Sequence, residues 1–254
     1  METAQDIVAR IIEELDSVDE IDCPKHGKQK SSNGQCWACI RESIEKEKAE
    51  AAKQAALTAR AALLSKSGIP RRFMHASFDN YCVDKTIKQQ QRAYAIARHY
   101  AENYDDSMDI GRSIIMTGAV GTGKTHLAVA IAQSALARGK SVCFTSVQKL
   151  IRSITDTYSR DAEQREKDVF SAYRAVYLLI LDEAGLQRGT ENERNIITEV
   201  ISDRYNDQKP TIITSNLPLE RLKDYLTERA VDRLLHGGVL LEMTWDSYRR
   251  RGDL

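Results

Sequence analysis

Residues 114–125 read Ile114-Ile115-Met116-Thr117-Gly118-Ala119-Val120-Gly121-Thr122-Gly123-Lys124-Thr125. The apolar start predicts a buried strand. The glycine-rich turn after it predicts the opening of a helix, where backbone N–H groups converge on phosphate oxygens. Side chains in place of the glycines would block this close approach of the backbone. A chance glycine-rich turn is the alternative, but the strand, the helix and the Lys-Thr pair together favour a P-loop.

The P-loop predicts a site for ATP and Mg²⁺. The Lys124 ammonium group is expected to reach the β- and γ-phosphates, and the Thr125 hydroxyl to complete the Mg²⁺ shell. The predicted nucleotide-binding residues are those of the loop and of the helix start: Gly118, Ala119, Val120, Gly121, Thr122, Gly123, Lys124, Thr125 and His126.

Two further strand ends complete the predicted ATP site. The apolar run 176–181 ends in Asp182 and Glu183, and the apolar run 211–214 is followed closely by Asn216. Parallel sheets bind ligands at the carboxyl ends of their strands. We expect Asp182 to hold Mg²⁺ through its water shell, Glu183 to orient and deprotonate the attacking water, and Asn216 to reach between that water and the γ-phosphate. An acidic pair after a strand is common in itself, and a turn role is the alternative for Asn216.

Strands and helices alternate through the C-terminal part of the chain. Near-continuous apolar strands in repeated strand–helix units imply a parallel sheet covered on both faces. The predicted fold class is α/β, with a five-stranded parallel sheet and a small N-terminal zinc-binding and helical region. Strands are expected near 113–117, 141–145, 176–181, 211–214 and 239–243, and helices near 124–137, near 147–158 and after a capping box of Thr190 and Glu193.

Four metal ligands lie close together near the N-terminus. Cys23 and His26 form one pair, and Cys36 and Cys39 form a second pair after nine intervening residues. Three thiolates and an imidazole are a standard tetrahedral set for structural Zn²⁺. Four protein ligands leave no open position for catalysis, so the expected role is to fold a segment too small for its own core. The alternative is a set of unrelated cysteines.

The sequence also predicts how the chain divides. Residues 3–15 resemble an amphipathic helix that either docks on its own domain or fits a groove in a partner protein. Residues 41–66 are rich in Ala, Glu, Lys, Gln and Arg and predict an exposed spacer helix, which ends at Gly68-Ile69-Pro70. The predicted parts are 1–40, an N-terminal helix and zinc-knuckle module; 41–67, a helical linker; and 68–254, the ATPase domain.

Composition narrows the functional classes. The 254 residues carry 37 basic and 37 acidic side chains, so any contact with nucleic acid must come from a local patch. No apolar run is long enough for a membrane span. Five cysteines without an export signal favour a reducing compartment, which here means the cytoplasm. Cys82 and Cys143 stand apart from the metal ligands, and each is expected to be a small buried hydrophobe.

Several pieces of the sequence together resemble the bacterial and phage DnaC-type helicase loaders, which are AAA+ ATPases related to the replication initiator DnaA. The resemblance covers about residues 68–250. It implies Mg²⁺-dependent ATP hydrolysis in DNA replication, assembly into an ATP-dependent oligomer, binding to single-stranded DNA and delivery of a DnaB-type replicative ring helicase. The pieces are Lys124-Thr125, Leu181-Asp182-Glu183, Thr214-Ser215-Asn216-Leu217, Trp245-Asp246-Ser247-Tyr248-Arg249, Gly68-Ile69-Pro70-Arg71-Arg72-Phe73 and Ala76-Ser77-Phe78-Asp79-Asn80-Tyr81.

The same resemblance makes Arg233 the expected arginine finger, whose guanidinium stabilises charge on the γ-phosphate of a neighbouring subunit. Arg229, one helical turn earlier, is the second choice. An ordinary surface ion pair with Glu228 or Asp232 is the alternative for either arginine. Arg249 resembles a further phosphate-sensing position.

Two other functions are considered. An IstB-like ATPase that assists a transposase shares the P-loop, the Asp-Glu strand and the segment 232–236. The zinc-like N-terminal region looks like that of a phage or prophage variant. This region and Trp245-Asp246 favour the loader. A zinc-containing adaptor with a degenerate ATPase is disfavoured because no ATPase motif is broken.

A DNA path is predicted along the helix after the second strand. Its cations are candidates for phosphate contacts, with aromatic rings as stacking partners. The alternative is that Leu150, Ile151 and Tyr158 lie in the core and that the arginines are merely solvated. The candidates are residues 149–152, which open with Lys149 and end with Arg152, followed by Arg160 and Arg165, and the rings of Tyr158 and Phe170.

Overall fold

The structure is a computed structural model, and it describes residues 20–32, 34–103 and 111–248. The helix expected at 3–15 lies outside these residues, as does Arg249. The described chain forms two compact units, which divide between Thr58 and Ala59. The boundaries expected after residues 40 and 67 stay predictions. No helix among the described residues is long and apolar enough to cross a membrane.

The first unit contains a small antiparallel sheet of β1 (Glu20–Cys23), β2 (Gly27–Ser32) and β3 (Gln35–Cys36). The sheet is followed by α2 (Trp37–Lys66), whose last residues belong to the second unit. Cys23 pairs with Gly27 across a tight turn, and Cys36 pairs with Ser31. The expected spacer helix is confirmed, but it begins at Trp37 and so includes the last metal ligand. Among the described residues of this unit only Cys23, Ser31 and Cys36 are buried, so this described part has no apolar core.

The second unit is built on a five-stranded sheet with the order β5-β6-β7-β4-β8. Every neighbouring pair is parallel, which confirms the predicted fold class. All five expected strands are present, although β6 starts two residues late and runs through the acidic pair. The strands are β4 (Ile114–Gly118), β5 (Val142–Ser146), β6 (Leu178–Ala184), β7 (Thr211–Ser215) and β8 (Val239–Met243).

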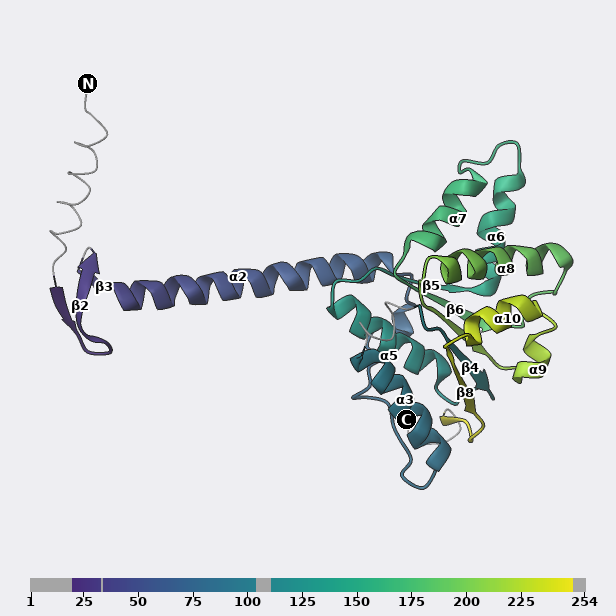
Figure 1. Ribbon diagram of the computed structural model, residues 1–254, viewed down its shortest axis with the longest axis horizontal. Helices are drawn as coiled ribbons and strands as arrows, with labels where there is room; N and C mark the ends of the chain where they lie inside the picture. The colour runs from purple at the N-terminus through teal and green to yellow at the C-terminus, as the bar shows by residue number, and fades with distance from the viewer. Residues whose placement is uncertain (1–19, 33, 104–110, 249–254) are drawn as a thin grey trace. The chain divides into compact units, whose positions relative to one another are not determined.

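Helices cover both faces of this sheet (Figure 1). Successive strand residues point to opposite faces. Ile114 and Met116 of β4 therefore join the core under α3 and α5, whereas Ile115 joins the core under α6, α8 and α10. The helices are η1 (Arg71–Phe73), α3 (Lys88–Glu102), α5 (Lys124–Ala137), α6 (Val147–Thr155), η2 (Asp156–Tyr158), α7 (Glu166–Ala175), α8 (Glu191–Asn206), α9 (Leu219–Leu222) and α10 (Glu228–Leu235).

The helix predicted for 147–158 is shorter than expected. α6 ends at Thr155, and the chain tightens into the 3₁₀ turn η2, which has three residues per turn instead of 3.6. Tyr158 is 53% exposed, so the alternative that it lies in the core is wrong. The capping box of Thr190 and Glu193 at the start of α8 is confirmed.

A fully buried arginine fixes the entry to two strands. The Arg204 guanidinium of α8 donates to the carbonyl oxygens of Val176 at 2.9 Å, Tyr177 at 3.1 Å and Pro210 at 2.6 Å. Desolvation lowers the pKa of Arg204 to about 10, so the side chain stays protonated at neutral pH and keeps all its donors. These bonds anchor the chain just before β6, which carries Asp182, and just before β7, whose end is followed by Asn216.

Candidate functional site

The glycine-rich loop joins β4 to α5 at the carboxyl edge of the sheet. Gly123, the last residue before α5, has a φ of 94°, which L side chains rarely adopt. A Cβ atom there would lie 2.6 Å from Tyr81 Cε2, so the packing also requires glycine. The loop therefore presents backbone N–H groups at a helix N-terminus, which is the arrangement that binds phosphate.

Lys124 is the first residue of α5, directly after this loop. Its side chain is 6% exposed, and its Nζ atom donates to the carbonyl oxygens of Gly118 and Ala119, each at 2.7 Å. The ammonium group is thus held beside the loop peptides, where it is in place for phosphate oxygens.

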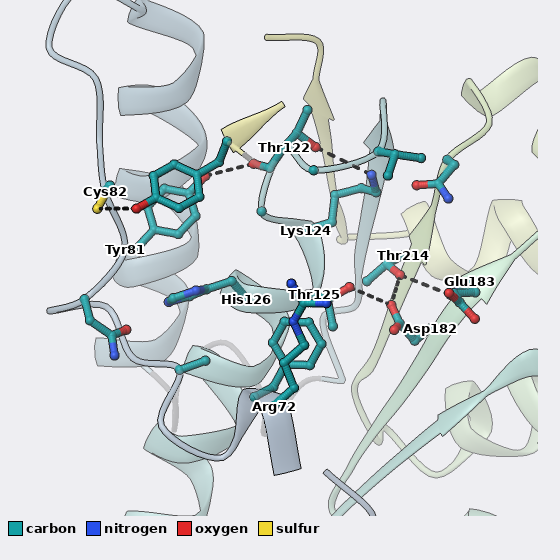
Figure 2. A pocket seen from close by; sticks show the side chains of 18 of the residues that line it. Arg72, Tyr81, Cys82, Thr122, Lys124, Thr125, His126, Asp182, Glu183 and Thr214 are labelled. Carbon is teal, nitrogen blue, oxygen red and sulfur yellow. Dashed lines mark hydrogen bonds between the residues drawn. The ribbon is translucent and has the colours of Figure 1, made fainter. Parts of the chain in front are cut away.

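Asp182 connects the loop to two neighbouring strands. Its Oδ1 atom accepts a hydrogen bond from the Thr125 hydroxyl at 3.1 Å and another from the Thr214 hydroxyl (Figure 2). Hydroxyl and carboxylate oxygens are the ligands that Mg²⁺ prefers in proteins. The predicted Mg²⁺ pair of Thr125 and Asp182 is therefore brought together.

Glu183 adopts a left-handed backbone conformation with a φ of 59°. Its N–H donates to the Thr214 hydroxyl at 3.2 Å, and the pairing of β6 with β7 is irregular between Leu181 and Ala184. Such strained backbone is concentrated at functional sites. The Glu183 side chain, at this irregular point of β6, is exposed.

A cavity of about 430 Å³ unites most of the predicted residues. It is lined by the loop from Val120 to His126, by Asp182 and Glu183, and by Asn216, which is exposed. Gly118 and Ala119 accept the Lys124 bonds at the base of the same loop.

The opposite side of the cavity was not predicted. It is formed by the segment before α3 and by Tyr248 near the C-terminus. The expectation that Cys82 is buried is wrong, because Cys82 is exposed and its Sγ atom lies 3.6 Å from the Tyr248 hydroxyl. Cys143 is only partly buried. The additional lining residues are Arg72, Phe73, His75, Ala76, Asn80, Tyr81, Cys82, Gln90, Thr214, Ser215 and Tyr248.

The two candidate finger arginines lie outside this cavity, on α10. Arg233 donates to the Ser202 hydroxyl and its guanidinium lies 5.7 Å from the centroid of the Tyr205 ring, both on α8. Arg229 is exposed. Among the described residues neither arginine forms an ion pair with Glu228 or Asp232. The alternative of an ordinary surface ion pair is therefore not observed in the described structure.

The predicted DNA-binding cations are all exposed. Lys149 and Arg152 lie on α6, and Arg160 and Arg165 lie between η2 and α7. Leu150 and Ile151 are buried, as the alternative proposed, whereas Tyr158 is exposed. Phe170 packs against the core. The cations are therefore accessible to solvent, and their contact with DNA stays a prediction.

The four predicted zinc ligands converge. Their ligand atoms all lie within 4.8 Å of one another. The sulfur atoms of Cys23 and Cys39 are 3.6 Å apart, and His26 Nδ1 lies between 3.4 and 3.7 Å from all three sulfurs. Tetrahedral zinc bonds of about 2.3 Å to sulfur and about 2.0 Å to nitrogen would place neighbouring ligand atoms roughly 3.5–3.8 Å apart. The donor set and its spacing fit Zn²⁺.

The surroundings of these ligands also fit a cation. Backbone N–H groups of Lys25 and His26 lower the pKa of Cys23 to about 6, whereas contact with Cys23 raises the pKa of Cys39 to about 11. His26 Nε2 lies 3.0 Å from Glu42 Oε1, and Lys25 pairs with the same carboxylate. Glu42 thus leaves the Nδ1 atom of His26 facing the sulfurs, as outer carboxylates do at zinc sites.

Comparisons with known proteins identify the family. A family model described as IstB-like ATP binding protein matches residues 54–254. A replicative helicase loader DnaC of Buchnera aphidicola subsp. Schizaphis graminum is 34% identical over 194 residues, which cover 75% of this chain and 77% of that relative. The chain belongs to the IstB-like/DnaC family. The resemblance predicted from the sequence motifs is confirmed.

Solved structures agree with this assignment. The crystal structure of the DnaC helicase loader is 27% identical to this IstB-like/DnaC protein, with a TM-score of 0.61 over 68% of this chain and 99% of that chain. AMPPCP-bound DnaA from Aquifex aeolicus, 24% identical with a TM-score of 0.59 over 70% and 52% of the two chains, shares the fold. The second unit is therefore an AAA+ ATP-binding domain, and the homology supports a general function in helicase loading during DNA replication.

Proposed function

We propose that this chain is an ATP-hydrolysing loader that delivers a DnaB-type replicative ring helicase to single-stranded DNA. The observation that carries the proposal is the contact of Thr125 with Asp182 beside the P-loop, inside a cavity of about 430 Å³. That volume lies within the range of small-molecule sites, roughly 300–1,000 Å³. Because relatives are named replicative helicase loaders, we infer that this ATP site serves DNA replication.

The site residues divide the work of hydrolysis. Lys124 binds the β- and γ-phosphates, and Thr125 and Asp182 hold Mg²⁺, which neutralises charge that develops on the phosphates. Glu183 orients the attacking water and accepts its proton, and Asn216 lies between that water and the γ-phosphate. The positions of these five side chains around one cavity support these roles.

Hydrolysis also depends on a second subunit. Arg233 lies on α10 against α8, outside the cavity of its own chain. A guanidinium placed there serves the γ-phosphate of an adjacent subunit in an ATP-dependent oligomer. Arg229 on the same helix is the second choice.

Two regions outside the ATP site have proposed binding roles. The exposed cations Lys149, Arg152, Arg160 and Arg165, with Tyr158, contact single-stranded DNA. The Cys₃His cluster binds one structural Zn²⁺ that folds the N-terminal unit. We place the protein in the cytoplasm, in line with its replication relatives.

Co-purification tests the proposed function directly. The chain is mixed with a DnaB-type helicase or with a transposase, in ATP or in ADP, and Lys124→Ala serves as the control that cannot bind nucleotide. Nucleotide-dependent capture of the helicase by the wild-type chain supports the loader. Capture of the transposase alone would instead support an IstB-like helper, which the DnaC relatives do not favour.

A further inference from the structure

Two sequence motifs that the ATP chemistry leaves unexplained meet on the P-loop. The segment 76–81 precedes the ATPase core, and the segment 245–248 follows its last strand. The Tyr81 hydroxyl and the Trp245 Nε1–H both donate to the carbonyl oxygen of Thr122, each at 3.1 Å. The Tyr248 backbone N–H donates to the neighbouring carbonyl oxygen of Gly121 at 2.9 Å. Figure 2 shows Tyr81 beside Thr122.

These bonds matter because a peptide group is planar. In a trans peptide the C=O and the following N–H point in opposite directions. The peptide after Thr122 is trans, so fixing the Thr122 carbonyl fixes the N–H of Gly123 on its other side. By the same reasoning, the bond from Tyr248 to Gly121 fixes the N–H of Thr122. Both N–H groups belong to the part of the loop that binds phosphate.

The Thr122 carbonyl also needs these donors. Thr122 is 1% exposed and Trp245 is 8% exposed, so water has little access to this oxygen. A buried carbonyl without a partner costs free energy comparable to a lost hydrogen bond. With both donors removed, the peptide would lower its free energy by turning the Thr122 oxygen toward the cavity. In that position the oxygen would repel phosphate.

The two side chains are themselves held in place. The Tyr81 ring stacks on Tyr94 with centroids 5.8 Å apart and meets the His126 ring edge-on at 5.3 Å. Burial raises the pKa of Tyr81 to about 12, so its hydroxyl stays protonated and able to donate. Trp245 lies within the core that includes α5.

We propose that Tyr81 and Trp245 are positioning residues of the nucleotide site, which hold the Thr122 carbonyl outward and thereby direct the Gly123 N–H at phosphate. This inference rests on the proposed function of the P-loop. It gives the two motifs that flank the ATPase core a common role, although they lie more than 160 residues apart in the sequence.

The test measures ADP affinity by calorimetry with the full chain. Tyr81→Phe removes only a hydroxyl, and because Trp245 still donates we expect ADP affinity to fall about 3-fold. Trp245→Phe should have a similar effect. The double variant leaves the Thr122 carbonyl without either donor, and its ADP affinity should fall about 30-fold. This loss is larger than the product of the two single losses. Under saturating ATP the turnover number should stay within about 2-fold of wild type. The reason is that losing a residue that only supports ground-state binding raises KM and leaves kcat unchanged.

Tyr94→Phe is the matched control. Tyr94 stacks on Tyr81 and donates to Phe78 O at 3.2 Å, so its loss perturbs the same aromatic cluster without touching the loop. Melting curves of the nucleotide-free variants report folding separately from binding. If Trp245→Phe does not fold, the 3-fold difference between Tyr81→Phe and Tyr94→Phe still decides the matter.

Three outcomes count against the inference. Unchanged ADP affinity in the double variant would overturn it, provided that wild type binds ADP and Lys124→Ala does not. An equal loss in Tyr94→Phe would overturn it in favour of general packing. Absence of ADP binding by wild type would overturn the proposed function, and the inference with it.

Discussion

The zinc site offers the most direct test of how the N-terminal unit folds. The perturbations are removal of the metal by a chelator and the substitution Glu42→Gln. The four ligand atoms already lie within 4.8 Å of one another, so the binding free energy should lie in the range for structural zinc, about 10–16 kcal/mol. At about 1.4 kcal/mol per tenfold, this range corresponds to a dissociation constant of roughly 10⁻⁷ to 10⁻¹¹ M. The described part of this unit buries no apolar cluster of its own, so the metal must supply most of its stability.

The assay has two readouts. Metal analysis of protein purified without chelator should find one Zn²⁺ per chain, and chelation should then expose residues 20–40 to protease while ATP binding persists. Glu42→Gln keeps the size of the side chain but weakens its hydrogen bond to His26, and should therefore lower zinc affinity 10–100-fold. Glu45→Gln, six residues after Cys39 on the exposed surface of α2, is the matched control and should change nothing.

Two results would refute this reasoning. Absence of stoichiometric metal would remove the zinc site altogether. Equal zinc affinity in Glu42→Gln and Glu45→Gln would show that the contact between Glu42 and His26 does not orient the ligand. Cys82→Ser should keep full zinc stoichiometry, because Cys82 is exposed in the other unit.

The remaining predictions concern the ATPase and DNA. Lys124→Ala should lose nucleotide binding, whereas Glu183→Gln should keep binding and lose about 10²–10⁴-fold in turnover; equal hydrolysis by Glu183→Gln and wild type would remove Glu183 from the role of base. Arg233→Ala should bind ATP but hydrolyse it slowly, and mixing it with Lys124→Ala should restore some activity; full activity of Arg233→Ala alone, without rescue, would assign the finger elsewhere. Lys149→Ala with Arg152→Ala should weaken single-strand binding and reduce the slope of log affinity against log salt by about 1.4, at about 0.7 per phosphate contact; an unchanged slope would place the DNA path elsewhere.

The sequence was most informative where chemistry or periodicity is local. The P-loop lies in eight consecutive residues, and the zinc ligands lie within 17 residues, so spacing alone predicted both clusters. The strand ends at Asp182 and Asn216 were predictable because parallel strands bring their carboxyl ends to one edge. In the structure Asp182 accepts a hydrogen bond from Thr125, 57 residues earlier, as that rule requires.

Long-range packing was the part that the sequence did not predict. The cavity wall from Arg72 to Cys82 carries no periodic or spacing signal that relates it to the loop. Arg204 shows the same limit: a charged residue on a helix ordinarily predicts exposure, yet this one is fully buried because several carbonyl oxygens satisfy its donors. The end of the helix predicted for 147–158 was also missed, because the helical period fails where α6 gives way to η2.

The contacts of the P-loop explain why such distant segments belong to one site. A loop that directs its N–H groups at phosphate must direct its C=O groups away, and in a buried loop those oxygens need donors from elsewhere in the chain. Tyr81 and Trp245 provide them from the two ends of the ATPase core. Asp182 likewise joins the loop to β7 through Thr214. Arg233 instead packs on α8, outside this set. Each chain therefore gathers in one cavity the groups proposed to bind ATP, but holds the arginine proposed to complete hydrolysis away from that cavity. On this reasoning the ATP site is ordered by its own chain and made catalytic by assembly.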